Sequence, residues 1–295
     1  MDTITKRIIL TPLNILYKIN PKMELKILFR IKQGYKLNLK EPKTFNEKIQ
    51  WIKLYDKNPL MSKCVDKYTV REYVNSKGCS EILNDLLWEG FNPDDIPFDK
   101  LPKKFVIKVT HGSTFNIICT DKQKMNMEDT RRKLKKWLKE KFIPCYGEWF
   151  YGVEKPRIIV ERYIESQSEL KDYKVFCFNG IPQYIAVYSN RQINNGKPCQ
   201  EIYDLKWNFV NEHTNNYSLP KTLTNRPKYF DKLLEYSKIL SRDFKHARID
   251  FFIEDECIYF GEITFTSSAG FGKFSSKQFE EEMGKNLILP KEGNS

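Results

Sequence analysis

The sequence predicts an α+β fold with two mainly antiparallel sheets and covering helices. Three observations lead to this prediction. From residue 105 onward, short apolar runs alternate with turn-forming residues, as expected of strands. Asn179-Gly180 separates two such runs, and this dipeptide is the strongest short signal for a β-hairpin. Stretches with one apolar face stand before and between the strands, where helices would cover the sheets.

Length and composition narrow the class of protein. The chain of 295 residues is 40% hydrophobic and 30% charged, which is enough for a core and unlike a disordered chain. No stretch approaches the roughly 18 apolar residues needed to span a bilayer, and the N-terminal residues make a poor signal peptide. Seven scattered cysteines without CxxC spacing, beside three histidines, argue against a zinc site and indicate a reducing compartment, the cytoplasm.

The charge balance is basic. Fifty lysines and arginines against 38 acidic residues give a net charge of +12, which suits nucleic acid, an anionic membrane surface or a phosphorylated ligand. The basic residues are spread along the chain rather than gathered in one arm. We therefore expect no nucleic-acid partner.

Residues 1–44 are expected to form a basic, amphipathic helical arm. Lysines and arginines alternate there with leucines and isoleucines, and Pro21 divides the stretch into two short helices. Two roles are open for this arm. It packs on its own protein, or residues 1–34 lie on a membrane surface.

A helical region, residues 45–100, is expected to lead into the sheets. Thr44 and Glu47 form the sequence pattern of a capping box, which predicts a helix over residues 45–55. A second helix is predicted over residues 62–74.

The predicted strands then follow in chain order. They are residues 105–109, 117–120, 157–164, 172–178, 182–188, 247–253 and 258–265. Two amphipathic helices are predicted between them, at residues 128–142 and 229–241.

Two acidic residues in the last predicted hairpin are its most informative feature. If the turn is centred near Glu256, Asp250 and Glu262 face each other, with Cβ atoms about 4.5–5.5 Å apart. Two carboxylates in otherwise apolar strands need a cation between them, and oxygen ligands suit Mg²⁺. The alternative is a register that differs by one residue and turns one carboxylate to solvent.

Two lysines also lie inside apolar strands, Lys108 and Lys174. A lysine in such a place needs an anionic partner. The loop after Lys108 contains Gly112, Ser113 and Thr114, whose backbone N–H groups could meet phosphate oxygens. Two cations and two carboxylates on separate strands suit a nucleotide with Mg²⁺. The alternative for Lys108 is an edge lysine that reaches to water.

These motifs, in this order, resemble the ATP-grasp superfamily and more narrowly the TupA-like (teichuronopeptide-biosynthesis) ATP-grasp family. They are LNLKEPKTFNEKIQWIKLYDKNPL, Asp66-Lys67, FVIKVTHGSTFNII, IIVERYI, DYKVFCFNG, and ARIDFFI with YFGEITF. The resemblance covers about residues 35 to 275. It implies the ATP-grasp fold, with a nucleotide bound between a small lobe, residues 101–165, and a large lobe, residues 166–295, that carries the metal site.

The resemblance also implies roles for individual residues. Those expected to contact ATP are Lys67 and Lys108 at the phosphates, Gly112, Ser113 and Thr114 in a lid, Glu161, Arg162, Tyr163 and Ile164 along the adenine edge, and Glu165 near the ribose. Those expected to act near the transferred phosphoryl group are Lys174 and Arg248. Those expected to bind Mg²⁺ are Asp250, Glu262 and Thr264, and Thr264 departs from the asparagine of many relatives.

The resemblance implies an ATP-dependent carboxylate–amine ligase. ATP would convert a carboxylate to an acyl phosphate, and an amine would then displace phosphate to form an amide. The family suggests a uronic acid or amino acid in cell-surface polysaccharide biosynthesis, such as capsule or teichuronopeptide. The arm, residues 1–34, would then contact the inner face of the membrane or polysaccharide-assembly enzymes. Two alternatives stay open: a kinase-like phosphotransferase and a glycosyltransferase.

Overall fold

The computed structural model describes residues 8–166, 169–189, 198–254 and 256–290. Its helices are α2 (Thr11–Ile19), α3 (Pro21–Gln33), α4 (Phe45–Tyr55), α5 (Leu60–Val65), α6 (Val70–Ser76), α7 (Met127–Leu138), α8 (Phe230–Ser241) and α9 (Lys277–Asn286). Its strands are β1 (Leu86–Gly90), β2 (Phe105–Val109), β3 (Asn116–Cys119), β4 (Ile158–Arg162), β5 (Asp172–Phe178), β6 (Ile181–Ser189), β7 (Cys199–Tyr203), β8 (His246–Glu254) and β9 (Cys257–Thr264).

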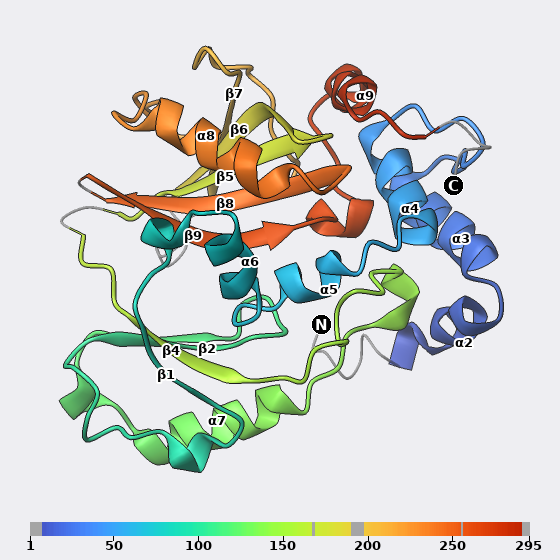
Figure 1. The fold of residues 1–295 in the computed structure, drawn as a ribbon. Helices are drawn as coiled ribbons and strands as arrows, with labels where there is room; N and C mark the ends of the chain where they lie inside the picture. Colours follow the sequence, from blue (N-terminus) through green and yellow to red (C-terminus); the bar gives the residue numbers. More distant parts are fainter. Residues whose placement is uncertain (1–7, 167–168, 190–197, 255, 291–295) are drawn as a thin grey trace.

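The strands form two separate sheets, one above the other in Figure 1. The small sheet has the order β1-β4-β2-β3 and the large sheet the order β7-β6-β5-β8-β9. All paired neighbours run antiparallel. Helix α7 lies beneath the small sheet and α8 lies against the large sheet (Figure 1). The predicted α+β class, with two antiparallel sheets and covering helices, is therefore confirmed.

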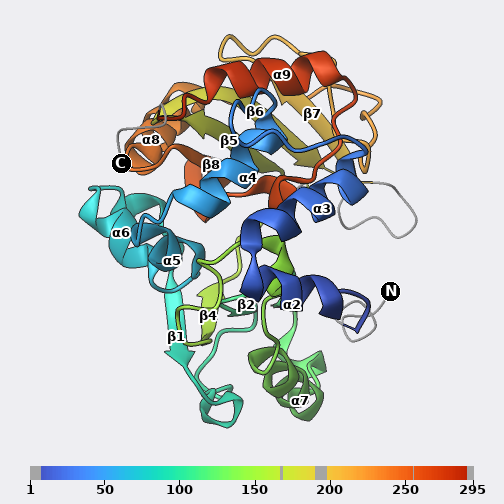
Figure 2. The same ribbon diagram turned by 90° about the vertical axis from the view of Figure 1, so that its right-hand side faces the viewer.

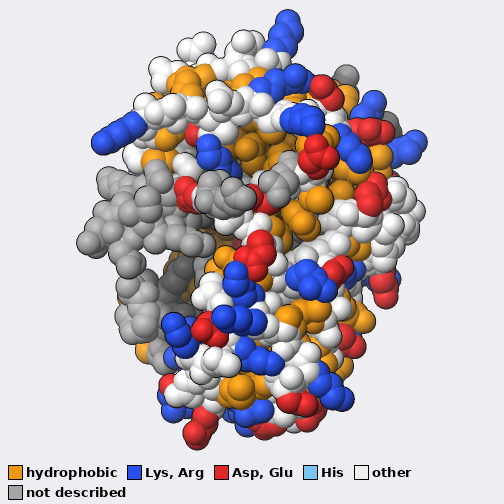
Figure 3. Space-filling view, turned by 90° about the vertical axis from the view of Figure 1, so that its left-hand side faces the viewer, with side chains coloured by type: hydrophobic (Ala, Val, Ile, Leu, Met, Phe, Trp, Pro, Cys, Tyr) orange, Lys and Arg blue, Asp and Glu red, His pale blue; other side chains and the backbone are white. Residues whose placement is uncertain are grey.

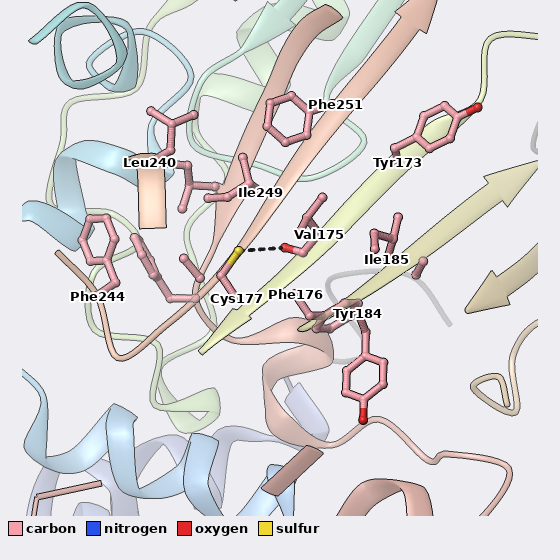
Figure 4. Close-up of a cluster of buried hydrophobic side chains, with 14 of the residues drawn as sticks. Tyr173, Val175, Phe176, Cys177, Tyr184, Ile185, Leu240, Phe244, Ile249 and Phe251 are labelled. Carbon is pink, nitrogen blue, oxygen red and sulfur yellow. Dashed lines mark hydrogen bonds between the residues drawn. The ribbon is translucent and has the colours of Figure 1, made fainter. Parts of the chain in front are cut away.

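Side chains alternate across the large sheet, and this alternation separates its core from its polar face. Val175, Cys177 and Ile249 point toward α8, where the Cys177 thiol donates to the Ser237 carbonyl. Figure 4 shows part of this buried cluster, with Leu240 of α8 beside these residues. The positions between them in β5 and β8 lie on the other face of the sheet. There Phe176 and Phe178 pack against Phe45 of α4, whereas Lys174, Arg248 and Asp250 line a cavity that the small sheet also borders.

The capping box and the first hairpin form as the sequence predicts. The Thr44 hydroxyl accepts from the Glu47 N–H at 3.3 Å, and a Glu47 carboxylate oxygen accepts from the Thr44 N–H at 3.1 Å. Asn179 and Gly180 have φ angles of 50° and 78°, the left-handed pair of a type I′ turn. That turn sets the register of β5 against β6.

The prediction of one helix over residues 62–74 was wrong. Two short helices, α5 and α6, form instead, and the break between them begins at Asp66. The Asp66 carboxylate accepts from the N–H groups of Tyr68 at 2.9 Å and Thr69 at 3.0 Å, and these bonds replace helical ones. Because of this break, Lys67 lies outside both helices and next to the small sheet, where its N–H donates to the Thr110 carbonyl at 3.4 Å.

Other differences follow from pairing and packing that a local pattern does not contain. Strands β1 and β7 and helix α9 were not predicted. Strand β1 lies within the predicted helical region 45–100 and completes the small sheet. Helix α7 ends at Leu138 instead of residue 142, and Phe142, beyond its end, stacks on Tyr151 with ring centroids 4.8 Å apart.

Some predicted features lie outside the described residues. They are residues 1–7 of the arm, residues 167–168, 190–197 and 291–295 of the predicted large lobe, and Asp255 in the last turn. The described part of the arm forms α2 and α3, which divide at Pro21 as expected. None of the helices in the described residues has the length and apolarity that a bilayer crossing requires.

Candidate functional site

A cavity of about 580 Å³ opens between the two sheets. From the small sheet and its neighbouring loops it is lined by Lys67, Lys108 and residues 113–116. From the large sheet it is lined by Asp172, Lys174, Arg248, Asp250 and Glu262, among others. The positions singled out by their charge in apolar strands thus lie around one space.

A buried ion cluster forms the floor of this cavity. Strand pairing sets Lys174 opposite Asp250 and Asp250 opposite Glu262. The Arg248 guanidinium holds both Asp250 oxygens, at 2.7 Å through Nε and 2.8 Å through Nη2. Lys174 donates to Asp250 and also pairs with Asp172, with 2.9 Å between Nζ and Oδ2. Asp250 is therefore surrounded by cations, as a buried carboxylate requires.

Asp250 and Glu262 share one face but differ in exposure. A bulge at Gly261 keeps Glu262 opposite Asp250, and a Cβ at position 261 would lie 3.0 Å from the Asp250 carbonyl oxygen. The Asp250 side chain is 3% exposed, whereas that of Glu262 is 41% exposed. The alternative register, with one carboxylate turned away, is excluded. Both carboxylates line the cavity, and Glu262 is the more exposed of the two.

The charges around the cluster set the protonation of its members. Burial acts to raise the pKa of Glu262, but Lys67, Lys174 and Arg248 outweigh it and lower that pKa to about 2. Burial also raises the pKa of Asp250, and Arg248 and Lys174 act against this. For Lys174, burial acts to lower the pKa, and the carboxylates of Asp250 and Asp172 raise it. Glu262 is therefore ionised at neutral pH.

Thr264 completes the polar group on β9. Its hydroxyl accepts from Arg248 Nη2 at 3.0 Å and donates to Glu262 Oε1 at 3.2 Å. The oxygen atoms of Asp250, Glu262 and Thr264 thus converge on one side of the large sheet. In the described residues, His, Cys, Asp and Glu side chains form no metal-binding group of three or more. A donor set of two carboxylates and a hydroxyl fits Mg²⁺, which keeps waters and takes phosphate oxygens as further ligands.

The small sheet contributes two lysines. Lys108 pairs with Glu161 at 2.5 Å, so its anionic partner is a carboxylate of the neighbouring strand β4. Lys67 donates from Nζ to the Gly112 carbonyl at 2.9 Å. Burial lowers the pKa of Lys67, and Glu262 across the cavity acts in the opposite direction. The two lysines face the carboxylates of the large sheet.

The predicted lid lies at the cavity edge. Ser113 and Thr114 line the cavity, and Thr114 has a φ of 64°, a conformation that favours glycine. The Gly112 carbonyl accepts the hydrogen bond from Lys67 Nζ. A Cβ at position 112 would lie 2.2 Å from the Phe115 ring. Glycine is thus needed at position 112 by the packing of Phe115.

The segment predicted to contact adenine, residues 161–164, already makes several contacts within the protein. Glu161 is buried and holds Lys108, with Arg71 3.4 Å away. The Arg162 N–H already donates to Asp85, and its carbonyl accepts from Asn84. The Arg162 N–H is therefore already used, while its carbonyl can accept a second hydrogen bond, and the adenine contact stays a prediction for Glu161, Arg162, Tyr163 and Ile164. Their side chains and that of Arg162 do not line the cavity.

Glu165 lies apart from the ion cluster. Its carboxylate is exposed and pairs with Lys104 at 2.6 Å. It does not line the cavity, so the ribose contact stays a prediction.

Several cavity residues were missed by sequence reasoning. They are Asn46, Asp172, Tyr184, Tyr188, Gln200 and Thr214. The cavity position of Asp172 could have been predicted from the sequence, because Asp172 precedes Lys174 by two residues and so shares its sheet face. Gln200 had none, since β7 was not predicted. Its amide accepts from the Thr214 N–H at 2.6 Å and donates to the Tyr188 hydroxyl at 2.5 Å.

Comparison with known proteins gives one family and several similar folds. The profile of the family described as TupA-like ATPgrasp matches residues 47–288. The comparison with curated proteins gave no match. Among solved structures, an L-amino acid ligase from Bacillus licheniformis has 12% identity and a TM-score of 0.45, over 86% of this chain and 55% of that chain.

Two further solved structures have a similar degree of likeness. The D-alanine–D-alanine ligase from Bacillus anthracis complexed with ATP has 15% identity and a TM-score of 0.41, over 70% of this chain and 57% of that chain. The ATP-grasp ligase PsnB complexed with a phosphomimetic variant of its minimal precursor, Mg and ADP has 11% identity and a TM-score of 0.41, over 74% and 56%. The match spans little more than half the length of each of these proteins.

Proposed function

Because the chain belongs to the TupA-like ATP-grasp family, we propose that it is an ATP-dependent carboxylate–amine ligase that forms an amide through an acyl phosphate. One observation carries this proposal. Lys174 and Arg248 lie with Asp250 and Glu262 on the floor of a cavity whose opposite wall presents lysines. Cations facing a pair of carboxylates suit a polyphosphate with its metal ion.

The residues of the two walls have separate tasks. Lys67 and Lys108 bind the phosphates of ATP from the small sheet. Asp250 and Glu262, with the Thr264 hydroxyl, hold Mg²⁺. Bound Mg²⁺ supplies positive charge at the phosphate oxygens. Ser113 and Thr114 cover the phosphates from the lid.

The reaction needs positioning and charge compensation rather than a covalent enzyme intermediate. A substrate carboxylate oxygen bonds to the γ-phosphorus, the bond to the β-phosphate oxygen breaks, and ADP leaves. The amine then attacks the acyl carbon, phosphate leaves with the oxygen that joined it to carbon, and the amine loses a proton. Arg248 and Lys174 lie beside the transferred phosphoryl group and balance its charge in both steps.

The rest of the cavity supports a ring-shaped carboxylate substrate. Beyond the ion cluster the walls are aromatic and amide: Tyr184, Tyr188, Gln200, Tyr217 and Phe274. Aromatic faces stack on sugar rings, and hydroxyls and amides bind their polar edges. Asn46 also lines this space, and its side-chain Nδ2 donates to the Gly272 carbonyl at 2.7 Å.

We therefore infer a uronic acid as the carboxylate and an amino acid as the amine. Ser267 supports this assignment. Its hydroxyl lies 3.3 Å from Arg248 Nη1 and so stands next to the groups that would react. The biological role we propose is the modification of a cell-surface polysaccharide such as capsule or teichuronopeptide. The enzyme would work in the cytoplasm, where ATP is available, close to the membrane on which such polymers are assembled.

An isotope experiment tests the ligase reaction directly. Uronic acids labelled with ¹⁸O in the carboxylate are paired with amino acids, and ADP, phosphate and product are followed by mass spectrometry. The acyl phosphate mechanism transfers one ¹⁸O to inorganic phosphate for each amide formed. Glu262→Gln is expected to abolish the transfer, and Lys228→Met, at an exposed lysine outside the cavity, to leave it unchanged.

The same experiment separates the kinase-like alternative, which would use the same cations and carboxylates. A stable phosphorylated product that forms without any amine would reject the ligase and favour phosphotransfer to a hydroxyl. Binding of a nucleotide-sugar in place of ATP would instead favour a glycosyltransferase.

A further inference from the structure

The N-terminal helices present an apolar face that the packing of the protein does not explain. Helices α2 and α3 lie next to each other at the surface (Figure 2). Of the sixteen exposed large hydrophobic side chains in the described residues, seven lie in this short stretch. These seven, which we call the arm face, are Ile8, Ile9, Ile15, Ile19, Met23, Ile27 and Ile31.

The arm holds onto the protein through a different set of residues. The buried side of α3 consists of Leu25, Leu28 and Phe29. Met23, Ile27 and Ile31 recur every four residues on its other side, whereas α2 has no buried residue at all. The core contacts of α3 are therefore complete without the arm face. A large exposed apolar face of this kind marks an interaction site.

The charge around the arm face is of one sign. Within residues 8–33 the exposed charged side chains are Lys18, Lys22, Lys26, Arg30 and Lys32. The one acidic residue in this range, Glu24, is buried. On the opposite face of the molecule, shown in Figure 3, basic and acidic side chains are interspersed. The arm thus combines exposed isoleucines with a uniformly positive border.

We propose that the arm face docks on an anionic lipid surface. The isoleucines would enter the boundary between headgroups and acyl chains, and the cations would lie at the headgroups. A second copy of the chain is a poorer occupant, because two arm faces would bring their cations together. No helix of the described residues could cross the bilayer, so the contact is peripheral. Docking of the arm on lipid does not depend on the ligase reaction.

Vesicle flotation with the full chain tests this proposal. The vesicles are phosphatidylcholine alone or phosphatidylcholine with phosphatidylglycerol, each at low and high salt. One variant removes apolar contacts, Ile15→Ser with Ile19→Ser and Ile27→Ser. A second removes charge, Lys18→Gln with Lys22→Gln and Lys26→Gln.

Matched controls carry the same number of changes elsewhere on the surface. They are Leu205→Ser with Leu219→Ser and Leu223→Ser, and Lys133→Gln with Lys136→Gln and Lys139→Gln in and directly after α7. Thermal melting and ATP turnover in solution check that each variant is folded, since the arm face contributes to neither the core nor the cavity.

The expected result is binding that requires phosphatidylglycerol and weakens at high salt. Removal of three lysines should lower the partition coefficient on the order of 100-fold, the apolar variant should lower it similarly, and the controls should bind as the unchanged protein does. Absence of binding to the anionic vesicles, or arm variants that bind normally, would overturn the proposal. So would a dimer in sedimentation velocity that the apolar variant dissociates, without vesicle binding, because the occupant would then be a second copy.

Discussion

The two carboxylates of the ion cluster should respond differently to neutralisation. In Asp250→Asn, Arg248 and Lys174 lose the carboxylate that holds both of them in a buried place. Breaking a buried pair on one side costs about 3–5 kcal/mol. The loss in free energy of unfolding should be about 3 kcal/mol here, because Lys174 still pairs with Asp172 and Arg248 still pairs with Glu262.

Glu262→Gln should cost far less stability. The Glu262 side chain is 41% exposed and lies 3.3 Å from Arg248, so its loss should cost no more than about 1 kcal/mol. For a chain of this size the two variants would lower Tm by roughly 6–12 °C and less than about 4 °C, respectively. Both should lower ATP turnover strongly, because both carboxylates would hold the metal ion.

Thermal melting, urea unfolding and ADP release together measure this contrast. Asp231→Asn is the matched control, because its pair with Arg226 is exposed and its loss should change neither stability nor turnover. Equal destabilisation by Asp250→Asn and Glu262→Gln would refute the different burial assigned to the two acids. Normal turnover in Glu262→Gln would remove the metal site from this place.

Three further predictions follow from single contacts. Lys108→Met should raise KM for ATP at least about tenfold, since a charged hydrogen bond to phosphate is lost, while Lys228→Met, at an exposed lysine outside the cavity, should leave KM unchanged; equal effects in steady-state kinetics would contradict the phosphate role. Burial lowers the pKa of the His246 imidazole to about 3. Because the unfolded imidazole titrates near 6.5, stability should fall as pH drops below that value, by about 2 kcal/mol at pH 5. Urea unfolding at pH 7.5 and 5.0 should show this loss and show it reduced in His246→Phe; an unchanged loss would reject the assignment. Gly284→Ala should destabilise by at least about 2 kcal/mol despite the higher helix propensity of alanine, because a Cβ there would lie 2.1 Å from the Lys43 carbonyl oxygen; a raised Tm would refute this.

The sequence by itself determined the strands that carry the site. Lys174, Asp250 and Glu262 are charged residues in apolar runs, and the strand period of two places their side chains on a definite face. The Asn179-Gly180 turn and the short connection between β8 and β9 set local registers, which short-range chemistry specifies. The sequence predicted that Asp250 and Glu262 would lie opposite each other, but the β8–β9 turn alone would set Asp250 against Gly261. The bulge at Gly261, which the sequence did not predict, brings Glu262 into that position.

Only the tertiary structure decided which groups meet across the chain. Asp66 breaks a helix that periodicity alone would continue, and so brings Lys67 to Gly112. Glu161, predicted for its backbone, uses its side chain to hold Lys108. Strand β7 and its Gln200 depend on pairing with β6, which is not encoded in the local pattern. Local sequence specifies period and turns, whereas contacts between distant segments depend on how the two sheets and the arm pack together.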